Sequence, residues 1–309
     1  MMASATLEQG RQDWLAYGAL LMMGAVVYVV CREFPAELPA FMPWEFDWPV
    51  FLATALFLGW FWRGLHALPK AQRPRPWRIG AYVLGVLSAY AVLQTRIDYY
   101  AQHAFFVHRA QQLVLHHIAP FLIALGTAGP VVRRGMPRFV ARVADWGPLQ
   151  RIVDFIQHPA VAPILFVGLL YFFLTPAVHT PVMLDRDLYD LMNWSMLIEG
   201  IFFWWLILDP RPKPPARLST LLRVFLILVI ELPQMLVGAI LSLSTTDYYP
   251  VYRICGRIMP IAALSDQHYG GLIIWLPGTM MSLAAMIVVL VNLRLNEERA
   301  EHALQGGNS

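Results

Sequence analysis

Residues 105–126 read FFVHRAQQLVLHHIAPFLIALG, an apolar run of helical length that contains His108, Gln111, Gln112, His116 and His117. A helix needs roughly 20 mostly apolar residues to cross a hydrocarbon layer about 30 Å thick. Polar side chains are costly to keep at that depth, so each of the five is a candidate functional residue. The segment therefore predicts a membrane-spanning helix with something to bind.

The composition extends this prediction to the whole chain. Hydrophobic residues make up 58% of the 309 residues and charged residues 14%, and the mean hydropathy is +0.53. One soluble core could not hide such a balance, and in lipid only helices or closed barrels satisfy the backbone. The apolar runs do not alternate as barrel strands do. We expect an all-α transmembrane bundle of seven or eight spans, at residues 14–31, 50–65, 79–95, 105–126, 159–178, 188–208, 220–244 and 271–293.

The distribution of basic residues predicts the orientation of this bundle. Most of the 23 Lys and Arg fall in loops on one side, which is the side that stays in the cytoplasm. Both termini are thus expected inside, with one transmembrane domain over 1–295 and a flexible cytoplasmic tail over 296–309. Residues 137–156 are expected to form an amphipathic segment on the inner surface. The net charge of +3 then reflects orientation and contact with lipid, and nucleic acid is not an expected partner.

The predicted orientation places several metal-ligating side chains on the outer, periplasmic side. Imidazole, thiolate and thioether are ligands suited to copper, and the softer Cys and Met favour Cu(I). No Cys or His spacing typical of a closed metal site occurs, so the prediction depends on convergence in space. A disulfide between Cys31 and Cys255 is an equally open alternative in an oxidising periplasm. The five candidate copper ligands are His103, His108, His179, His268 and Cys255.

Further polar residues lie deeper in the predicted spans. At about 100° per residue, His108, Gln112 and His116 form one slowly winding stripe, which fits either a transfer path or hydrogen bonds between helices. Glu199 lies in the sixth span and Glu231 in the seventh. We expect such carboxylates to form structural ion pairs or to be protonated, and Arg223, two turns before Glu231 on roughly the same face, is a candidate partner.

Two stretches, HRAQQLVLHHIAPFLIALG at 108–126 and DQHYGGLIIWLPG at 266–278, resemble the multi-spanning CtaG-type (caa3-type) cytochrome c oxidase assembly factors. EGIFFWW at 199–205 is similar to a third block of that family. The resemblance adds Asp266 and Gln267 to the candidate functional residues. It implies a multi-pass protein of the bacterial inner membrane that helps mature a haem-copper oxidase as a copper metallochaperone. The chain departs from the family at Gln112 and Asn193, where the family usually has His.

Three functions are compatible with these patterns. The first is an assembly factor that binds copper at the periplasm-facing site and delivers it to an oxidase subunit or to another assembly factor. The second is a transporter of copper or a small solute, with Gln112, His116 and Glu231 along its path. The third is an electron carrier in which paired His on two helices hold a b-type haem. We do not expect an enzyme, because the sequence has no nucleophile motif, phosphate-binding glycine loop or HExxH.

Overall fold

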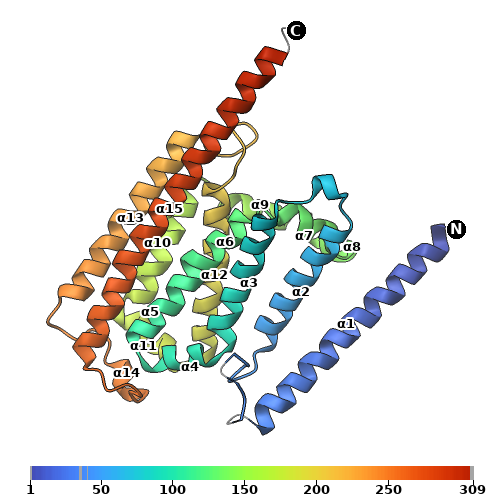
Figure 1. Cartoon of the computed structure of the whole chain (residues 1–309). Coiled ribbons are helices and arrows are strands. Elements are labelled where there is room, and N and C mark those ends of the chain that lie inside the picture. Colours follow the sequence, from blue (N-terminus) through green and yellow to red (C-terminus); the bar gives the residue numbers. More distant parts are fainter. Residues whose placement is uncertain (1, 35–36, 40, 307–309) are drawn as a thin grey trace.

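A computed structural model describes residues 2–34, 37–39 and 41–306, and helices dominate this part of the chain, which contains no strand. The prediction of an all-α fold is confirmed. Most of the longer helices pack side by side, and α1 stands apart from them (Figure 1). The elements are α1 (Met2–Glu33), α2 (Trp48–His66), η1 (Lys70–Gln72), α3 (Pro76–Gln94), α4 (Arg96–His103), α5 (Phe105–Leu113), η2 (Val114–Ile118), α6 (Ala119–Leu125), α7 (Gly129–Gly135), α8 (Arg138–Ala144), α9 (Gly147–Ile156), α10 (Val161–Leu174), α11 (Pro176–Leu184), α12 (Arg186–Ile207), α13 (Thr220–Leu243), α14 (Val251–Ile254) and α15 (Ala263–Gly306).

Helices occupy all eight predicted span positions, but not all are apolar enough to be assigned to the membrane. Among the described residues, four helices are long and apolar enough to cross it: the part of α1 from Trp14, then α3, α13 and α15. The number rises to six if two bent helix pairs each count as one span. The other two positions are α2 and α12, and α12 carries the polar Asp190, Asn193 and Glu199. The seven or eight spans therefore remain a prediction.

The predicted fourth span is one helix with a π-helical turn in its middle. Helix α5 continues through η2, where the wider turn contains both His116 and His117, into α6. Thr127 then has φ of 47°, and the chain bends by 78° into α7. A wide turn places two successive histidines inside the bundle, which a regular helix does not do as easily.

The chain ends and the short helices define the two ends of the bundle. Helices α4, α11 and α14 lie at one, here named the α14 end (Figure 1). Helices α7, α8 and α9 lie at the other, the α8 end, toward which the start of α1 and the end of α15 also point. The basic loops predicted to be cytoplasmic gather at the α8 end. Which end faces the cytoplasm stays a prediction.

Two predicted segments differ in detail from the structure. Residues 137–156 form two short helices, α8 and α9, and not one. They expose Phe139, Val143, Ile152 and Phe155, as expected of a lipid-facing amphipathic surface. The predicted tail, 296–309, is helical as far as Gly306, because α15 runs through it. Its flexibility stays a prediction.

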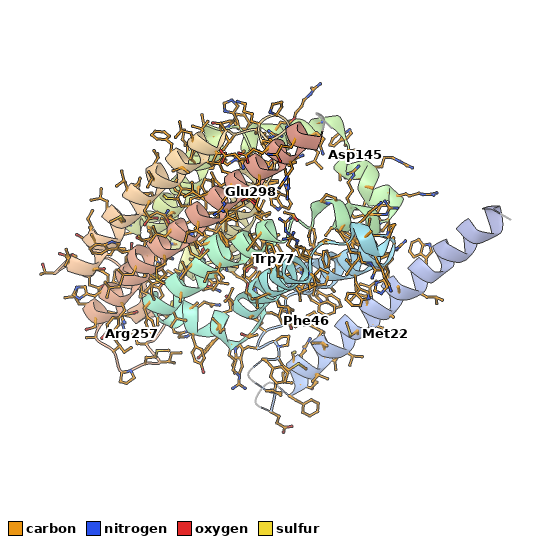
Figure 2. All side chains as sticks on the ribbon, turned by 45° about the horizontal axis from the view of Figure 1, so that its top comes forward. Met22, Phe46, Trp77, Asp145, Arg257 and Glu298 are labelled. Carbon is orange, nitrogen blue, oxygen red and sulfur yellow. The ribbon has the colours of Figure 1, made fainter. Side chains whose placement is uncertain are left out.

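Helix α1 touches the remaining bundle at few points. Its apolar stretch is only 11% buried, and the side chains around Met22 stand clear of the packed helices (Figure 2). One contact is the hydrogen bond from Trp60 Nε1 to the hydroxyl of Tyr17, 3.2 Å long. The bundle that positions the polar residues is therefore built by α2 to α15.

Small residues allow the closest helix contacts in that bundle. A Cβ atom on Gly135 would lie 1.8 Å from the Trp60 carbonyl oxygen, and one on Gly64 would lie 1.9 Å from that of Val131. A Cβ on Gly200 would lie 2.7 Å from the His116 carbonyl oxygen. Helix α12 can therefore pack directly against the π turn because residue 200 has no side chain.

Candidate functional site

Two histidines meet at one buried tyrosine near the α14 end. The hydroxyl of Tyr252, on α14, lies 2.9 Å from His108 Nδ1 and 3.0 Å from His179 Nε2. The two imidazole rings are 5.3 Å apart between centroids. All three side chains are fully buried. Helices α5, α11 and α14, far apart in sequence, thus share one hydrogen-bonded cluster.

The direction of each hydrogen bond follows from a single backbone carbonyl. His179 Nδ1 lies 2.9 Å from the Phe173 carbonyl oxygen, which can only accept, so Nδ1 carries the ring proton. Burial and the charge of Arg109 lower the pKa of His179 to about 3, so its Nε2 has no proton and accepts from Tyr252. Burial raises the pKa of Tyr252, which keeps its hydroxyl protonated.

The same reasoning fixes the state of His108. The Tyr252 hydroxyl donates its one proton to His179, so its oxygen accepts a hydrogen bond from the Nδ1–H of His108. His108 Nε2 is then an unprotonated nitrogen with a free lone pair. It is fully buried and has no hydrogen-bond partner among the described residues. A bare imidazole nitrogen of this kind has the chemistry to bind a metal ion or to accept a hydrogen bond.

Aromatic and sulfur-containing side chains surround this cluster. The Phe105 ring stacks on Tyr249 at 4.2 Å, and the Arg109 guanidinium lies 5.2 Å from the Phe105 ring centre. Arg109 Nε and Nη2 have no hydrogen-bond partner in the described part of the chain. Three methionines belong to the same buried cluster as Tyr252, and Cys255 packs against it; they are Met183, Met192 and Met196.

Asp266 and Gln267 of α15 position the start of α5 and the loop before α14. The Asp266 carboxylate accepts the backbone N–H groups of Phe105 and Phe106, at 3.0 and 2.8 Å, and pairs with Arg257. A carboxylate at a helix N-terminus stabilises it through the exposed N–H groups. Gln267 accepts the N–H of Tyr248 and donates to the Thr246 carbonyl. Both residues therefore hold the backbone around His108 and Tyr252.

A second polar cluster is centred on Asp98 of α4 and includes Gln111, one helical turn after His108 on α5. Gln111 donates to its carboxylate at 2.7 Å and Tyr189 donates at 2.9 Å. Burial raises the pKa of Asp98 to about 6, although hydrogen bonds from Tyr189, Gln111 and Gln102 act in the opposite direction. Gln111 thus links α5 to α4 and α12.

The five candidate copper ligands do not all converge. His108 and His179 meet, but the part of the chain that the structure describes holds no group of three or more His, Cys, Asp or Glu suited to a metal ion. His268 donates to the Ser244 carbonyl and His103 to the Tyr99 carbonyl. The His103 contact lies within α4, and the His268 contact joins α15 to the end of α13, so neither ring is hydrogen-bonded to the Tyr252 cluster.

Both thiols are free in the structure, so the disulfide between Cys31 and Cys255 that the sequence left open is not formed. Cys31 lies at the end of α1, the helix that stands apart, and Cys255 follows α14. Burial raises the pKa of the Cys255 thiol. Its thiolate, the form that binds copper, is therefore disfavoured.

Deeper polar residues of the fourth span pair with other helices. Gln112 donates to Asn193 at 2.7 Å, and these are the two positions where the resemblance predicted His. His116 lies 3.0 Å from a Glu199 oxygen, and His117 lies 2.9 Å from the amide oxygen of Gln234. These contacts favour the interhelical role for His116 and His117.

Of the two explanations left open for Glu231, an ion pair with Arg223 or a protonated acid, the ion pair is not formed. Glu231 accepts the hydroxyl groups of Thr279 and Ser282 on α15, at 2.5 and 2.6 Å. Arg223 instead donates to backbone carbonyl groups in the connection before α13, including that of Leu218. Hydroxyls on the neighbouring helix supply closer donors than the arginine two turns away.

Sequence reasoning did not identify Tyr252, Tyr189 or Asn193 as site residues. Tyr252 lies on the short helix α14, in a connection with several aromatic residues, and a tyrosine is ordinary at a membrane surface. Its role depends on contacts 73 and 144 residues away. The local sequence contains no signal that could have revealed it.

The sequence profile of one family, described as cytochrome c oxidase caa3 assembly factor (Caa3_CtaG), matches residues 55–295. The chain belongs to this family. The match begins within α2 and ends within α15, so this caa3 assembly factor homologue contains the whole polar site inside its family region.

Mycobacterial proteins are similar to this caa3 assembly factor homologue. An uncharacterized protein of Mycobacterium bovis and one of Mycobacterium tuberculosis are each 27% identical over 268 residues, which is 83% of this chain. One of Mycobacterium leprae is 27% identical over 277 residues, or 85% of this chain. The chain spans 40% of the length of these relatives. No solved structure matches it.

Proposed function

We propose that this membrane protein assists cytochrome c oxidase assembly by holding copper transiently at His108 and passing it to an oxidase subunit or another assembly factor. The family supports the assembly role. The observation that carries the copper step is the buried, unprotonated Nε2 of His108, fixed in that state by Tyr252, His179 and the Phe173 carbonyl.

The residues around His108 suit copper as a cargo. A metal-bound imidazole normally donates its other ring N–H to a second group, as His108 does to Tyr252. Thioether groups of the same cluster are soft ligands that favour Cu(I). Gln112 and Asn193 carry amides, which are weaker copper ligands than His. His108 is therefore the first contact, and the partner protein supplies further ligands.

The nearby charge of Arg109 favours release over storage. Its guanidinium packs on Phe105, on the same turn of α5 as His108, and no carboxylate neutralises it among the described residues. A fixed cation repels a bound metal cation. A site with one free imidazole and a neighbouring positive charge suits a short-lived complex during transfer.

Copper binding by the purified protein tests this proposal. Cu(I) is titrated in competition with a chromophoric chelator, and His108→Ala is expected to reduce binding to the level of a protein-free sample. His66→Ala is the matched control, because His66 is an exposed ring on α2 that, among the described residues, is hydrogen-bonded only to the Trp62 carbonyl. Equal copper binding by both variants would contradict the role of His108.

A complementary experiment tests the assembly role in cells. Deletion of the gene is expected to lower cytochrome c oxidase activity, and added copper is expected to restore part of it. His108→Ala should behave like the deletion while the protein remains in the membrane at a normal level. Full oxidase activity in the deletion strain would overturn the assembly role itself.

The deep polar residues give less support to transport or haem binding. The cavity lined by His116, His117 and Gln112 measures about 20 Å³, which is room for one water molecule. A hydrated metal ion or a macrocycle does not fit there. His108 and His179 are also bridged by Tyr252, so they do not face each other across a space that haem could fill.

A further inference from the structure

A large cavity at the α8 end is lined by seven arginines. It measures about 1210 Å³ and lies between the start of α3, the α6–α7 turn, the connection after α12 and the last turns of α15. No Asp or Glu lines it among the described residues. The seven are Arg73, Arg75, Arg78, Arg133, Arg134, Arg211 and Arg299.

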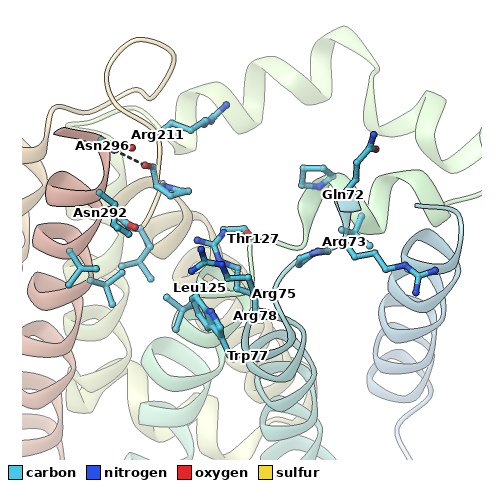
Figure 3. Close-up of a pocket in the computed structure, with 18 of the residues that line it drawn as sticks. Gln72, Arg73, Arg75, Trp77, Arg78, Leu125, Thr127, Arg211, Asn292 and Asn296 are labelled. Atoms are coloured by element: carbon cyan, nitrogen blue, oxygen red, sulfur yellow. Dashed lines mark hydrogen bonds between the residues drawn. The ribbon is translucent and has the colours of Figure 1, made fainter. Parts of the chain in front are cut away.

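The arginines come from four separate segments and are only partly neutralised. Figure 3 shows Arg75 and Arg78 beside Thr127, with Arg211 near Asn296 across the cavity. Arg78 donates to the Thr127 hydroxyl at 2.8 Å. Of the seven, Arg133 and Arg211 form ion pairs with aspartates in the described part of the chain. The remaining positive charge needs an anion to balance it.

The opposite wall of the cavity is apolar and faces the surroundings of the bundle. Ile287, Val291 and Leu295 of α15 line it and are 63%, 51% and 39% exposed. Trp77 lines it as well, half exposed and next to the Arg78 guanidinium at 5.1 Å. Tryptophan is typical of the membrane interface. The cavity thus joins a cationic floor to a surface that contacts lipid chains.

The backbone of Thr127, beside the arginines, is strained. Its φ of 47° lies in the left-handed region, which a β-branched residue adopts with strain. A glycine at position 127 would relieve that strain, but it would remove the hydroxyl that accepts a hydrogen bond from Arg78. Strained residues of this kind are enriched where a ligand is held.

We infer that this cavity binds the phosphate headgroup of an anionic phospholipid, with the acyl chains lying along Ile287, Val291 and Leu295 of α15. A free phosphate would use the arginines but not the apolar wall. An acidic peptide would not need a wall that opens to lipid. Several arginines in one cavity favour a headgroup with more than one phosphate, as in cardiolipin, over a single phosphate.

Lipid binding by matched charge variants tests the inference. The protein is purified in detergent, and lipid retention and thermal unfolding are measured with cardiolipin, phosphatidylglycerol, phosphatidylcholine or inorganic phosphate. The pocket variant replaces three arginines by Gln: Arg75→Gln, Arg78→Gln and Arg299→Gln. The control removes the same charge from exposed positions of α8 and α9 at the same end of the bundle: Arg138→Gln, Arg142→Gln and Arg151→Gln.

We expect the pocket variant to bind cardiolipin at least about tenfold more weakly, since it loses three charge-assisted contacts, and the control to bind as the parent does. Phosphatidylcholine and inorganic phosphate should leave the unfolding temperature unchanged. Equal losses in the two variants would show nonspecific attraction to a basic surface and overturn the inference. A shift with inorganic phosphate as large as with cardiolipin would assign the cavity to a free anion. Arg75→Gln alone, at an exposed side chain, repeats the test if the triple variant does not fold.

Discussion

Replacing Tyr252 by Phe removes one hydroxyl and leaves the ring that packs under Phe105. The hydroxyl makes two hydrogen bonds, at 2.9 Å to His108 and at 3.0 Å to His179. Both rings are fully buried, so water does not replace the lost partner. The substitution therefore leaves one buried donor, His108 Nδ1–H, and one buried acceptor, His179 Nε2, without a hydrogen-bond partner.

The size of the effect follows from these two stranded groups. A buried polar group left without its partner costs about 1 to 3 kcal/mol, which gives roughly 2 to 6 kcal/mol for the pair. His108 is affected in a second way, because nothing then holds its proton on Nδ1. If Nε2 takes the proton, it cannot bind copper. Loss of such a supporting group weakens metal binding about 10-fold or more.

The neighbouring tyrosine supplies a matched control for this measurement. Tyr249 is buried, stacks on Phe105 and donates one hydrogen bond, 2.7 Å long, to the Leu174 carbonyl. Tyr249→Phe should lower the free energy of unfolding by about 1 kcal/mol and leave copper affinity unchanged. Both variants are unfolded in detergent with increasing denaturant, and Cu(I) affinity is measured by competition on the folded protein.

Two results would refute the reasoning. If Tyr252→Phe and Tyr249→Phe lower stability equally, the Tyr252 hydroxyl does not bridge two histidines. If Tyr252→Phe loses stability but binds copper as tightly as the parent, the state of His108 does not depend on the hydroxyl.

Other predictions concern packing, a buried carboxylate and pH. Gly135→Ala should lower the free energy of unfolding by about 1 to 3 kcal/mol, because the new Cβ would lie 1.8 Å from a backbone carbonyl oxygen. A Cβ on Gly59 would have nothing within 4 Å, so Gly59→Ala should change the free energy of unfolding by less than about 1 kcal/mol. Denaturant titration of both variants tests this difference. The two carboxylate oxygens of Glu231 accept the hydroxyls of Thr279 and Ser282, and Glu231→Gln replaces one of these oxygens by an NH2 donor. This change should lower the free energy of unfolding by about 1 to 2 kcal/mol. Unchanged stability would show that the carboxylate does not accept both hydroxyls. The pKa of Asp98 is raised from 3.8 to about 6, so the folded protein keeps a proton that the unfolded chain loses. The stability that the protonated Asp98 gives the folded state is therefore fully present below about pH 4. Up to about 3 kcal/mol of it is lost as pH rises through 6. Thermal unfolding between pH 4.5 and 7.5 should show this slope in the parent and not in Asp98→Asn.

Local patterns in the sequence predicted the helices and the inward-facing polar residues. Apolar runs of helical length coincide with helices at all eight positions, and His108, Gln112 and His116 are buried as the stripe predicted. These features depend on hydropathy and periodicity, which act within a few turns. They therefore appear in the sequence without any tertiary information.

The partners of those residues depend on helix packing, which the sequence did not reveal. Glu231 bonds to hydroxyls 48 and 51 residues away, not to the arginine on its own helix. Likewise, each basic loop predicted orientation by itself, but only the folded chain brings Arg75, Arg211 and Arg299 to one cavity. Local periodicity carries no information on which distant helices meet.

The fourth span has two groups of buried polar atoms without hydrogen-bond partners among the described residues, one around Gln112 and His117 and the other at His108. Arg109, Gln112 and His117 line the cavity of about 20 Å³, and each has a side-chain N or O atom without a partner among the residues described. The cavity has room for one water, which could accept from Arg109 and donate to Gln112 Oε1 and His117 Nδ1. His108 does not line that cavity, so the same water leaves its Nε2 open. His108 Nε2 therefore stays an open acceptor in the Tyr252 cluster among the described residues, and this nitrogen is where the proposed ligand would bind.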